Sequence, residues 1–430
     1  MSMAVEIYQN EYLADGAGEV HAVIRVISSG GRGPVAATQK AVVLVIDTSG
    51  SMDMPRTKIR EARRSAASAI GVLPDGTLFA LVAGYESARC VYPPGANRLV
   101  VANETTRAEA VEATRRIRID GGTAMSTWLD LVRTLLVPHQ NAIRLAYMLT
   151  DGKNEGEQQP ALDSAIERAV GAFQCDTRGV GSDWSPDQLR NISNRLLGHV
   201  DIIRSPEEMD DDFRTFMDRA IGRDIADVRL RIWTPRDSRI KLLKQAAPDI
   251  VDLTPSSIRV NSLTSDYPTG AWSGDERRDY HLVIALPPGE VGDEMLAARA
   301  SVMTGDAMAG QGLVRAVWTD DLDRSTRRVQ EVEACAGREE LSEAIQEGLE
   351  ARRRGDDDAA TVRLGDALRL AKAANDQAKV NGLLKIVDDV GRGTVKLKSK
   401  VDPLDEVELD TRSTRTVQLG RHTDPAGAST

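Results

Sequence analysis

Two apolar runs that each lead into an aspartate constrain the fold of this chain more than any other feature. Residues 42–46 are continuous and rich in β-branched side chains, and Asp47 follows them directly. Residues 145–149 lead through Thr150 into Asp151 in the same way. Short, uninterrupted apolar runs predict strands buried on both faces, as in the middle of a parallel sheet. Both aspartates are therefore expected at the carboxyl ends of sheet strands.

Oxygen-bearing side chains gather in the loops that follow these strands. The turn at residues 47–51 has them at alternate positions, with a glycine that lets the backbone turn. A second loop, residues 120–125, has a hydroxyl after paired glycines. A small hard cation such as Mg²⁺ prefers oxygen ligands in near-octahedral geometry, at about 2.1 Å. One loop cannot fill six positions, so we expect several loops to contribute. The candidate metal ligands are Asp47, Ser49, Ser51, Thr123 and Asp151.

This set resembles the metal-ion-dependent adhesion site of the von Willebrand factor A family, whose pattern is D-x-S-x-S, then a threonine, then an aspartate. The resemblance covers residues 40–222. It implies that Ser49, Ser51 and, in the ligand-bound form, Thr123 hold Mg²⁺ or Mn²⁺ directly, and that Asp47 and Asp151 act partly through water. It also implies that an open coordination position takes a carboxylate from a partner protein.

The segment around these loops alternates strands with helices. Such alternation predicts an α/β fold in which a doubly wound, mostly parallel sheet has helices on both faces. Ligands of such sheets bind beyond the carboxyl ends of the strands, where the candidate metal ligands lie. The predicted helices are residues 57–72, 107–119, 125–137, 161–173, 186–197 and 206–221.

Beyond residue 225 the helices give way to short strands separated by Pro, Gly and Asp turns, which predict an antiparallel β-sandwich. Residues 4–30 form a predicted hairpin that is too small to be stable alone, so we expect it to complete that sandwich. The predicted sandwich strands are residues 227–233, 250–253, 257–260, 280–286, 299–303 and 312–318.

The last quarter of the chain is predicted to be helical and then disordered. Helical spacing of apolar residues favours a three-helix bundle over residues 339–390, with one and a half tetratricopeptide units as the alternative. The tail loses apolar periodicity and is expected to be disordered. The predicted division is 1–36 (hairpin), 37–222 (von Willebrand factor A domain), 223–322 (sandwich), 326–391 (helical bundle) and 392–430 (tail).

Three threonines near acidic residues in the tail, Thr411, Thr414 and Thr416, are candidate phosphorylation sites. A phosphothreonine there would suit an Arg-lined forkhead-associated domain. A Ser/Thr kinase is then a further expected partner. The alternative is a tail that only increases solubility.

Composition excludes several classes of function. A formal net charge of −10 argues against a nucleic-acid binder. No run approaches the ~20 apolar residues of a membrane span, and the N-terminus has no secretory signal. Three widely spaced cysteines fit reduced thiols, so we expect a cytoplasmic location. The excess of Arg over Lys points to a GC-rich bacterium.

We expect a non-catalytic binding protein whose metal ion takes an acidic residue of a partner. One alternative is a scaffold in Ser/Thr kinase signalling with a phosphorylated tail. The other is a metal-assisted hydrolase that uses Asp47 or Asp151. No histidine lies close in sequence to Asp47, Thr123 or Asp151, which argues against an enzyme.

Overall fold

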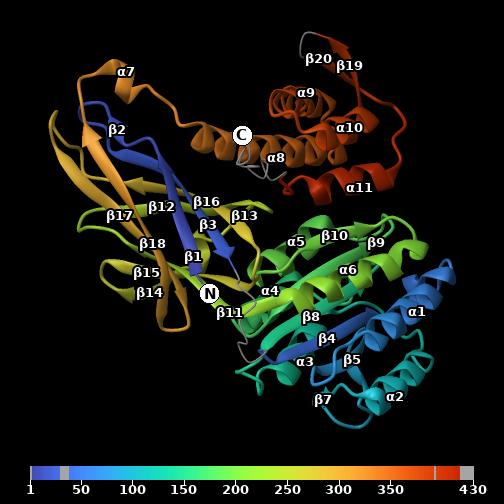
Figure 1. The fold of residues 1–430 in the computed structure, drawn as a ribbon. Helices are drawn as coiled ribbons and strands as arrows, with labels where there is room; N and C mark the ends of the chain where they lie inside the picture. The colour runs from blue at the N-terminus through green and yellow to red at the C-terminus, as the bar shows by residue number, and fades with distance from the viewer. Residues whose placement is uncertain (1, 30–37, 392–393, 417–430) are drawn as a thin grey trace, which may run out of the picture.

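The computed structural model describes residues 2–29, 38–391 and 394–416. Its ribbon consists of an α/β part, a part made of two packed sheets, and a helical part that lies beside both (Figure 1).

The α/β part is built on a seven-stranded sheet. Five strands are parallel, and two short strands run antiparallel to β5 at one edge. In spatial order they are β10 (Val200–Ile203), β9 (Gln174–Val180), β8 (Ile143–Thr150), β4 (Lys40–Asp47), β5 (Leu78–Gly84) and β6 (Ala88–Tyr92), with β7 (Val100–Val101) also beside β5.

Helices cover both faces of this sheet, which confirms the predicted doubly wound fold. One face packs against α1 (Thr57–Gly71), α2 (Glu104–Thr114) and α6 (Met209–Gly222). The other packs against α3 (Met125–Leu136), α4 (Gln159–Ala169) and α5 (Pro186–Arg195).

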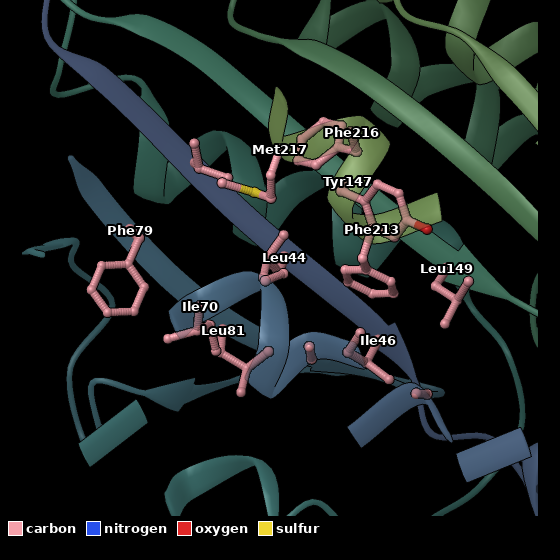
Figure 2. Packing of buried hydrophobic residues seen from close by; sticks show 14 of the residues in the cluster. Leu44, Ile46, Ile70, Phe79, Leu81, Tyr147, Leu149, Phe213, Phe216 and Met217 are labelled. Atoms are coloured by element: carbon pink, nitrogen blue, oxygen red, sulfur yellow. The ribbon is translucent and has the colours of Figure 1, made fainter. Parts of the chain in front are cut away.

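The central strand β4 shows why these residues form a parallel sheet. Every residue after Lys40 in this strand is buried. Its side chains alternate between the two cores: Leu44 and Ile46 face α1 and α6 (Figure 2), whereas Val43 and Val45 face α3. A strand covered on both faces needs apolar residues at every position, which explains the continuous run.

A second part consists of a five-stranded and a six-stranded sheet, with a shared apolar core. The five-stranded sheet contains β1 (Ser2–Gln9), β3 (Glu19–Ser29), β16 (Arg277–Ala285), β12 (Arg239–Ala247) and β13 (Val251–Asp252). The six-stranded sheet contains β14 (Ile258–Asn261), β15 (Thr264–Ser273), β11 (Arg223–Trp233), β17 (Glu294–Thr304), β18 (Ala307–Trp318) and β2 (Tyr12–Leu13). This is the expected antiparallel sandwich, apart from the parallel pair β2 and β18.

The N-terminal strands lie within this sandwich. β3 pairs with β16 along nine residues, from Glu19 opposite Ala285 to Ile27 opposite Arg277. The α/β part therefore lies in sequence between two strands of the sandwich, and its ends meet. Thr38 Oγ1 donates a hydrogen bond to the Asp224 carbonyl at 3.2 Å.

The predicted strands of the sandwich were incomplete. β12 and β15 were not predicted, because Lys241 and Lys244 interrupt the apolar pattern of the first and Pro268 and Gly270 that of the second. The predicted helix at 107–119 instead spans Glu104–Thr114. A reciprocal capping box between Asn103 and Thr106 starts it earlier.

The helical part follows the sandwich. It contains α7 (Leu322–Ser325), α8 (Gln330–Arg353), α9 (Asp357–Ala373), α10 (Gln377–Ile386), the hairpin of β19 (Val387–Gly391) with β20 (Thr394–Leu397), and α11 (Pro403–Arg412). The expected three helices are present, but α8 begins nine residues before the predicted start at 339. Within the described residues, no helix has the length and apolar character needed to cross a membrane.

The prediction of a disordered tail from 392 to 430 is wrong for residues 394–416. Asp402 caps α11, and Pro403 occupies its first position. The helix lies against α5 and β10 (Figure 1), and Asp410 is buried there between Arg190 and Arg353. Ion pairs of Asp410 add to the packing of Leu404, Val407 and Leu409 in this helix, and its many charged residues concealed that packing in the sequence. Residues 392–393 and 417–430 lie outside the described residues.

Candidate metal centre

Three loops at the carboxyl ends of β4 and β8 and before α3 meet at one place. Asp47 ends β4, and the following turn carries Ser49 and Ser51 into a short 3₁₀ helix, Gly50–Asp53. The Gly50 amide donates to the Gly121 carbonyl at 3.1 Å, which ties this turn to the loop of Thr123. Asp151 directly follows β8.

The hydroxyl groups from these loops converge. Ser49 Oγ and Ser51 Oγ lie 3.0 Å apart. A Cβ atom placed on Gly152 would lie 3.2 Å from Ser51 Oγ and 3.6 Å from Thr123 Oγ1, so both oxygens border this glycine. Two oxygens bound at about 2.1 Å in adjacent octahedral positions are about 3 Å apart, which matches the serine pair.

Asp47 lies beneath the hydroxyl groups and is fully buried. One carboxylate oxygen accepts from the Ser49 amide at 2.7 Å, and the other from Thr150 Oγ1 at 2.5 Å. Burial raises the pKa of Asp47 to about 6, although the hydrogen bonds from Ser49 and Thr150 act in the opposite direction. The carboxylate thus shapes the turn and places negative charge below it.

Asp151 is also fully buried, and both of its oxygens are engaged. Ser51 Oγ donates to Oδ1 at 2.6 Å, and Lys58 Nζ donates to Oδ2 at 2.5 Å. Because Ser51 gives its hydrogen to Asp151, Ser49 is the donor in the contact between the two serines, and Ser51 keeps one lone pair for a cation. Lys58 was missed in the sequence because its position in α1 is 93 residues from Asp151, and no local motif marks it.

The loop after Asp151 also fixes the position of Thr123. The Gly156 amide donates to the Thr123 carbonyl at 2.7 Å. Helix α3 starts at Met125 without a side-chain cap of its own. Instead, Asn154 Oδ1 accepts from the Met125 amide and Glu157 accepts from the Ser126 amide, each at 2.8 Å. Asn154 and Glu157 thus accept hydrogen bonds from backbone amides that have no partner within the helix. Sequence analysis did not identify these two residues.

The donor set fits a hard divalent cation. It offers hydroxyl and carboxylate oxygens and no thiolate or imidazole, a chemistry that suits Mg²⁺ or Mn²⁺ better than zinc. Within the described part of the chain, Thr123 Oγ1 has no hydrogen-bond partner, so its lone pairs are available to a cation. No group of three or more His, Cys, Asp or Glu side chains there could hold a metal. A metal at this site therefore depends on the three hydroxyl groups.

The candidate phosphorylation sites lie elsewhere, at and beyond the end of α11. Thr411 is buried, and its Oγ1 donates to the Val407 carbonyl at 2.6 Å. Thr414 and Thr416 are half-buried, and Thr416 Oγ1 donates to the Pro248 carbonyl at 2.9 Å. A kinase would reach Thr411 only after α11 had moved.

Comparison with known proteins agrees with this architecture. The sequence-family model of the von Willebrand factor type A domain matches residues 40–202. The family model of the von Willebrand factor type A C-terminal domain matches residues 369–413. The second match includes all of α11, the helix that was not predicted. Among curated proteins there is no match.

Solved structures extend the similarity to the whole chain. A von Willebrand factor type A protein from Catenulispora acidiphila is 43% identical, with 97% of each chain covered and a TM-score of 0.93. The ArnB paralog VWA2 from Sulfolobus acidocaldarius shares the fold at 14% identity, with 96% of this chain and 98% of that chain covered and a TM-score of 0.58. The chain therefore belongs to the von Willebrand factor type A family.

Proposed function

We propose that this chain is a non-catalytic binding protein that holds Mg²⁺ or Mn²⁺ and presents it to an acidic residue of a partner protein. Ser49, Ser51 and Thr123 would hold the ion directly, with Asp47 and Asp151 behind them. Domains of this family are in general metal-dependent protein-interaction modules. The observation that carries the proposal is the convergence of hydroxyl groups from two loops: Ser49 Oγ lies beside Ser51 Oγ, and both Ser51 Oγ and Thr123 Oγ1 border Gly152.

The charge of the ligands explains why the partner residue should be acidic. The three direct ligands are neutral hydroxyl groups, so they do not cancel the charge of the ion. Ser51 is exposed, whereas Ser49 and Thr123 are buried, so the site opens to solvent on the side of Ser51. Mg²⁺ retains several waters and exchanges one for an anionic oxygen. A carboxylate that approaches from this side would complete the coordination.

The same contacts argue against a metal-assisted hydrolase. A general base needs a free lone pair within reach of the proton that it removes. Both oxygens of Asp47 accept hydrogen bonds, from Ser49 and Thr150, and both oxygens of Asp151 accept them from Ser51 and Lys58. Each oxygen keeps a second lone pair, but both carboxylates are fully buried, which supports a structural role over that of a general base.

The first test is uptake of Mn²⁺ by the full chain, measured by calorimetry and by the electron paramagnetic resonance signal of free Mn²⁺. We expect one site, which the double variant Ser49→Ala/Ser51→Ala loses. Ser164→Ala, on the exposed surface of α4, is the matched control and should bind as the wild type does. Absence of Mn²⁺ uptake by the wild type at millimolar concentration would overturn the proposal.

The second test is a pull-down from a lysate of the source cell, in Mg²⁺ and in EDTA. Partners bound through the ion should be lost in EDTA and lost with the double serine variant. Partners retained equally under both conditions would contradict metal bridging.

A further inference from the structure

Lys58 brings a positive charge into the candidate metal centre. It lies in the first turn of α1, and its exposed fraction is 9%. Its ammonium group contacts Asp151, which is itself fully buried and bonded to Ser51. Ser51 Oγ is a proposed ligand, so only one carboxylate separates the ammonium group from the site of the ion.

This charge opposes a divalent cation at the same place. Asp47 and Asp151 lie behind the hydroxyl ligands, and their two negative charges would offset those of a divalent ion, so Lys58 would leave this group of charges with a net charge of +1. Like charges this close repel strongly in a poorly solvated environment. The ammonium group of Lys58 also competes with the ion for Asp151, because the same carboxylate would have to balance both positive charges.

We propose that the positive charge of Lys58 weakens metal binding. With the metal bound, the same charge keeps the centre positive, so that it attracts an acidic ligand. The inference rests on the proposed function, because it concerns the same ion. It assigns to Lys58 a positioning role through Asp151, without direct contact with the ion. The centre would then need a higher concentration of free Mg²⁺ or Mn²⁺ than its oxygen ligands alone require.

The test compares Mn²⁺ affinity in full-length variants, measured by calorimetry and by the resonance signal of free Mn²⁺. Lys58→Gln removes the charge but keeps a hydrogen-bond donor for Asp151, and Lys58→Met removes both. Lys58→Arg keeps the charge. Arg60→Gln is the matched control, since Arg60 is an exposed cation on the same helix that forms an ion pair with Glu61.

We expect the dissociation constant for Mn²⁺ to fall at least tenfold in Lys58→Gln and Lys58→Met. It should stay within threefold of the wild-type value in Lys58→Arg and Arg60→Gln. Added Mn²⁺ should also raise the unfolding midpoint more in Lys58→Gln than in the wild type, because, at a given concentration, a ligand that binds more tightly stabilises the folded state more.

The outcomes separate the two proposals. If the wild type binds Mn²⁺ and both charge-removing variants bind it equally or more weakly, Lys58 only supports Asp151 and the inference is wrong. If the wild type takes up no Mn²⁺ at millimolar concentration, the proposed function fails and the inference, which rests on it, fails with it. If either Lys58→Gln or Lys58→Met does not fold in EDTA, the Mn²⁺ affinity of the other variant decides the result.

Discussion

Ser51 donates a hydrogen bond to Asp151 at 2.6 Å, although 100 residues separate them in the sequence. The bond joins the turn after β4 to the loop after β8. Lys58 occupies the other oxygen of Asp151, so this one carboxylate holds two distant segments together. Its charge is therefore expected to matter both for the fold and for the metal.

Asp151→Asn should weaken Mn²⁺ binding at least tenfold. It should also lower the free energy of unfolding in EDTA by about 3 kcal/mol, because Lys58 would stay buried without a counter-ion. Calorimetric titration and urea unfolding measure the two effects. Asp53→Asn is the control, since Asp53 forms only an exposed pair with Arg56 at 3.9 Å. Unchanged stability of Asp151→Asn would show that Lys58 finds another partner.

Gly84 lies against Trp128, so a larger residue should disturb the wall behind the loop of Thr123. A Cβ atom at Gly84 would lie 2.5 Å from the indole ring. That ring donates to the Tyr85 carbonyl at 2.7 Å. Gly84→Ala should therefore cost about 1–3 kcal/mol in the free energy of unfolding. Gly71→Ala in α1 should not lower the free energy of unfolding, because a Cβ atom placed there would have no neighbouring atom within 4 Å. Equal stability of the two variants would contradict the close packing.

Asp410 should control the attachment of α11 to the α/β part. It is 2% exposed and pairs with Arg190 at 2.6 Å and with Arg353. Asp410→Ala leaves two guanidinium groups without their shared carboxylate, which should cost about 3–5 kcal/mol. Hydrogen exchange should become faster in α11 and remain slow in β4.

The control for this change is Glu350→Gln, which removes an exposed pair with Arg354. Such pairs contribute about 0–1 kcal/mol. If α11 of Asp410→Ala exchanged as slowly as in this control, the ion pairs would not be what holds the helix.

The contact between the sandwich and α8 should weaken in mild acid. His21 Nδ1 lies 3.3 Å from His281 Nε2, and His281 Nδ1 lies 2.9 Å from Glu339 Oε1 in α8. Burial, reinforced by the charge of His281, lowers the pKa of His21 below its ordinary value of 6.5. The unfolded chain then binds more protons than the folded chain just below pH 6.5. This contribution to stability is complete above pH 6.5 and is lost as the pH falls toward the folded pKa.

Unfolding midpoints between pH 7.5 and 5 measure this effect. His21→Gln should show a smaller loss of stability on acidification than the wild type, because it cannot be protonated. Parallel curves for the two proteins would exclude His21 as the source.

Features with a local cause could be predicted from the sequence. β4 and β8 are buried on both faces over residues 42–46 and 145–149, so every position of these two runs is apolar and each run can be recognised in the sequence alone. Asp47 and Asp151 could be placed in the same way, because the end of a central strand has a fixed location in a doubly wound sheet. The convergence of Ser49, Ser51 and Thr123 followed from the same topology.

Features held by distant charges could not be predicted. In the sequence, Lys58 cannot be distinguished from any other lysine of a helix, and only the fold places it beside Asp151. Asp410 belongs to a charged segment whose composition is typical of a solvated tail, but the arginines that neutralise it lie on α5 and α8. Long-range ion pairs leave no periodic signal, so a segment that depends on them resembles disorder.

The hydrogen bond between Thr38 and Asp224 has a consequence for the history and engineering of this protein. A domain whose first and last residues are adjacent can be inserted into or deleted from another domain without disrupting that domain's fold. Joining Ser28 to Asp224 through a short linker would delete the α/β part, and the two-sheet sandwich should still fold. The same junction could accept a foreign module with similarly spaced ends.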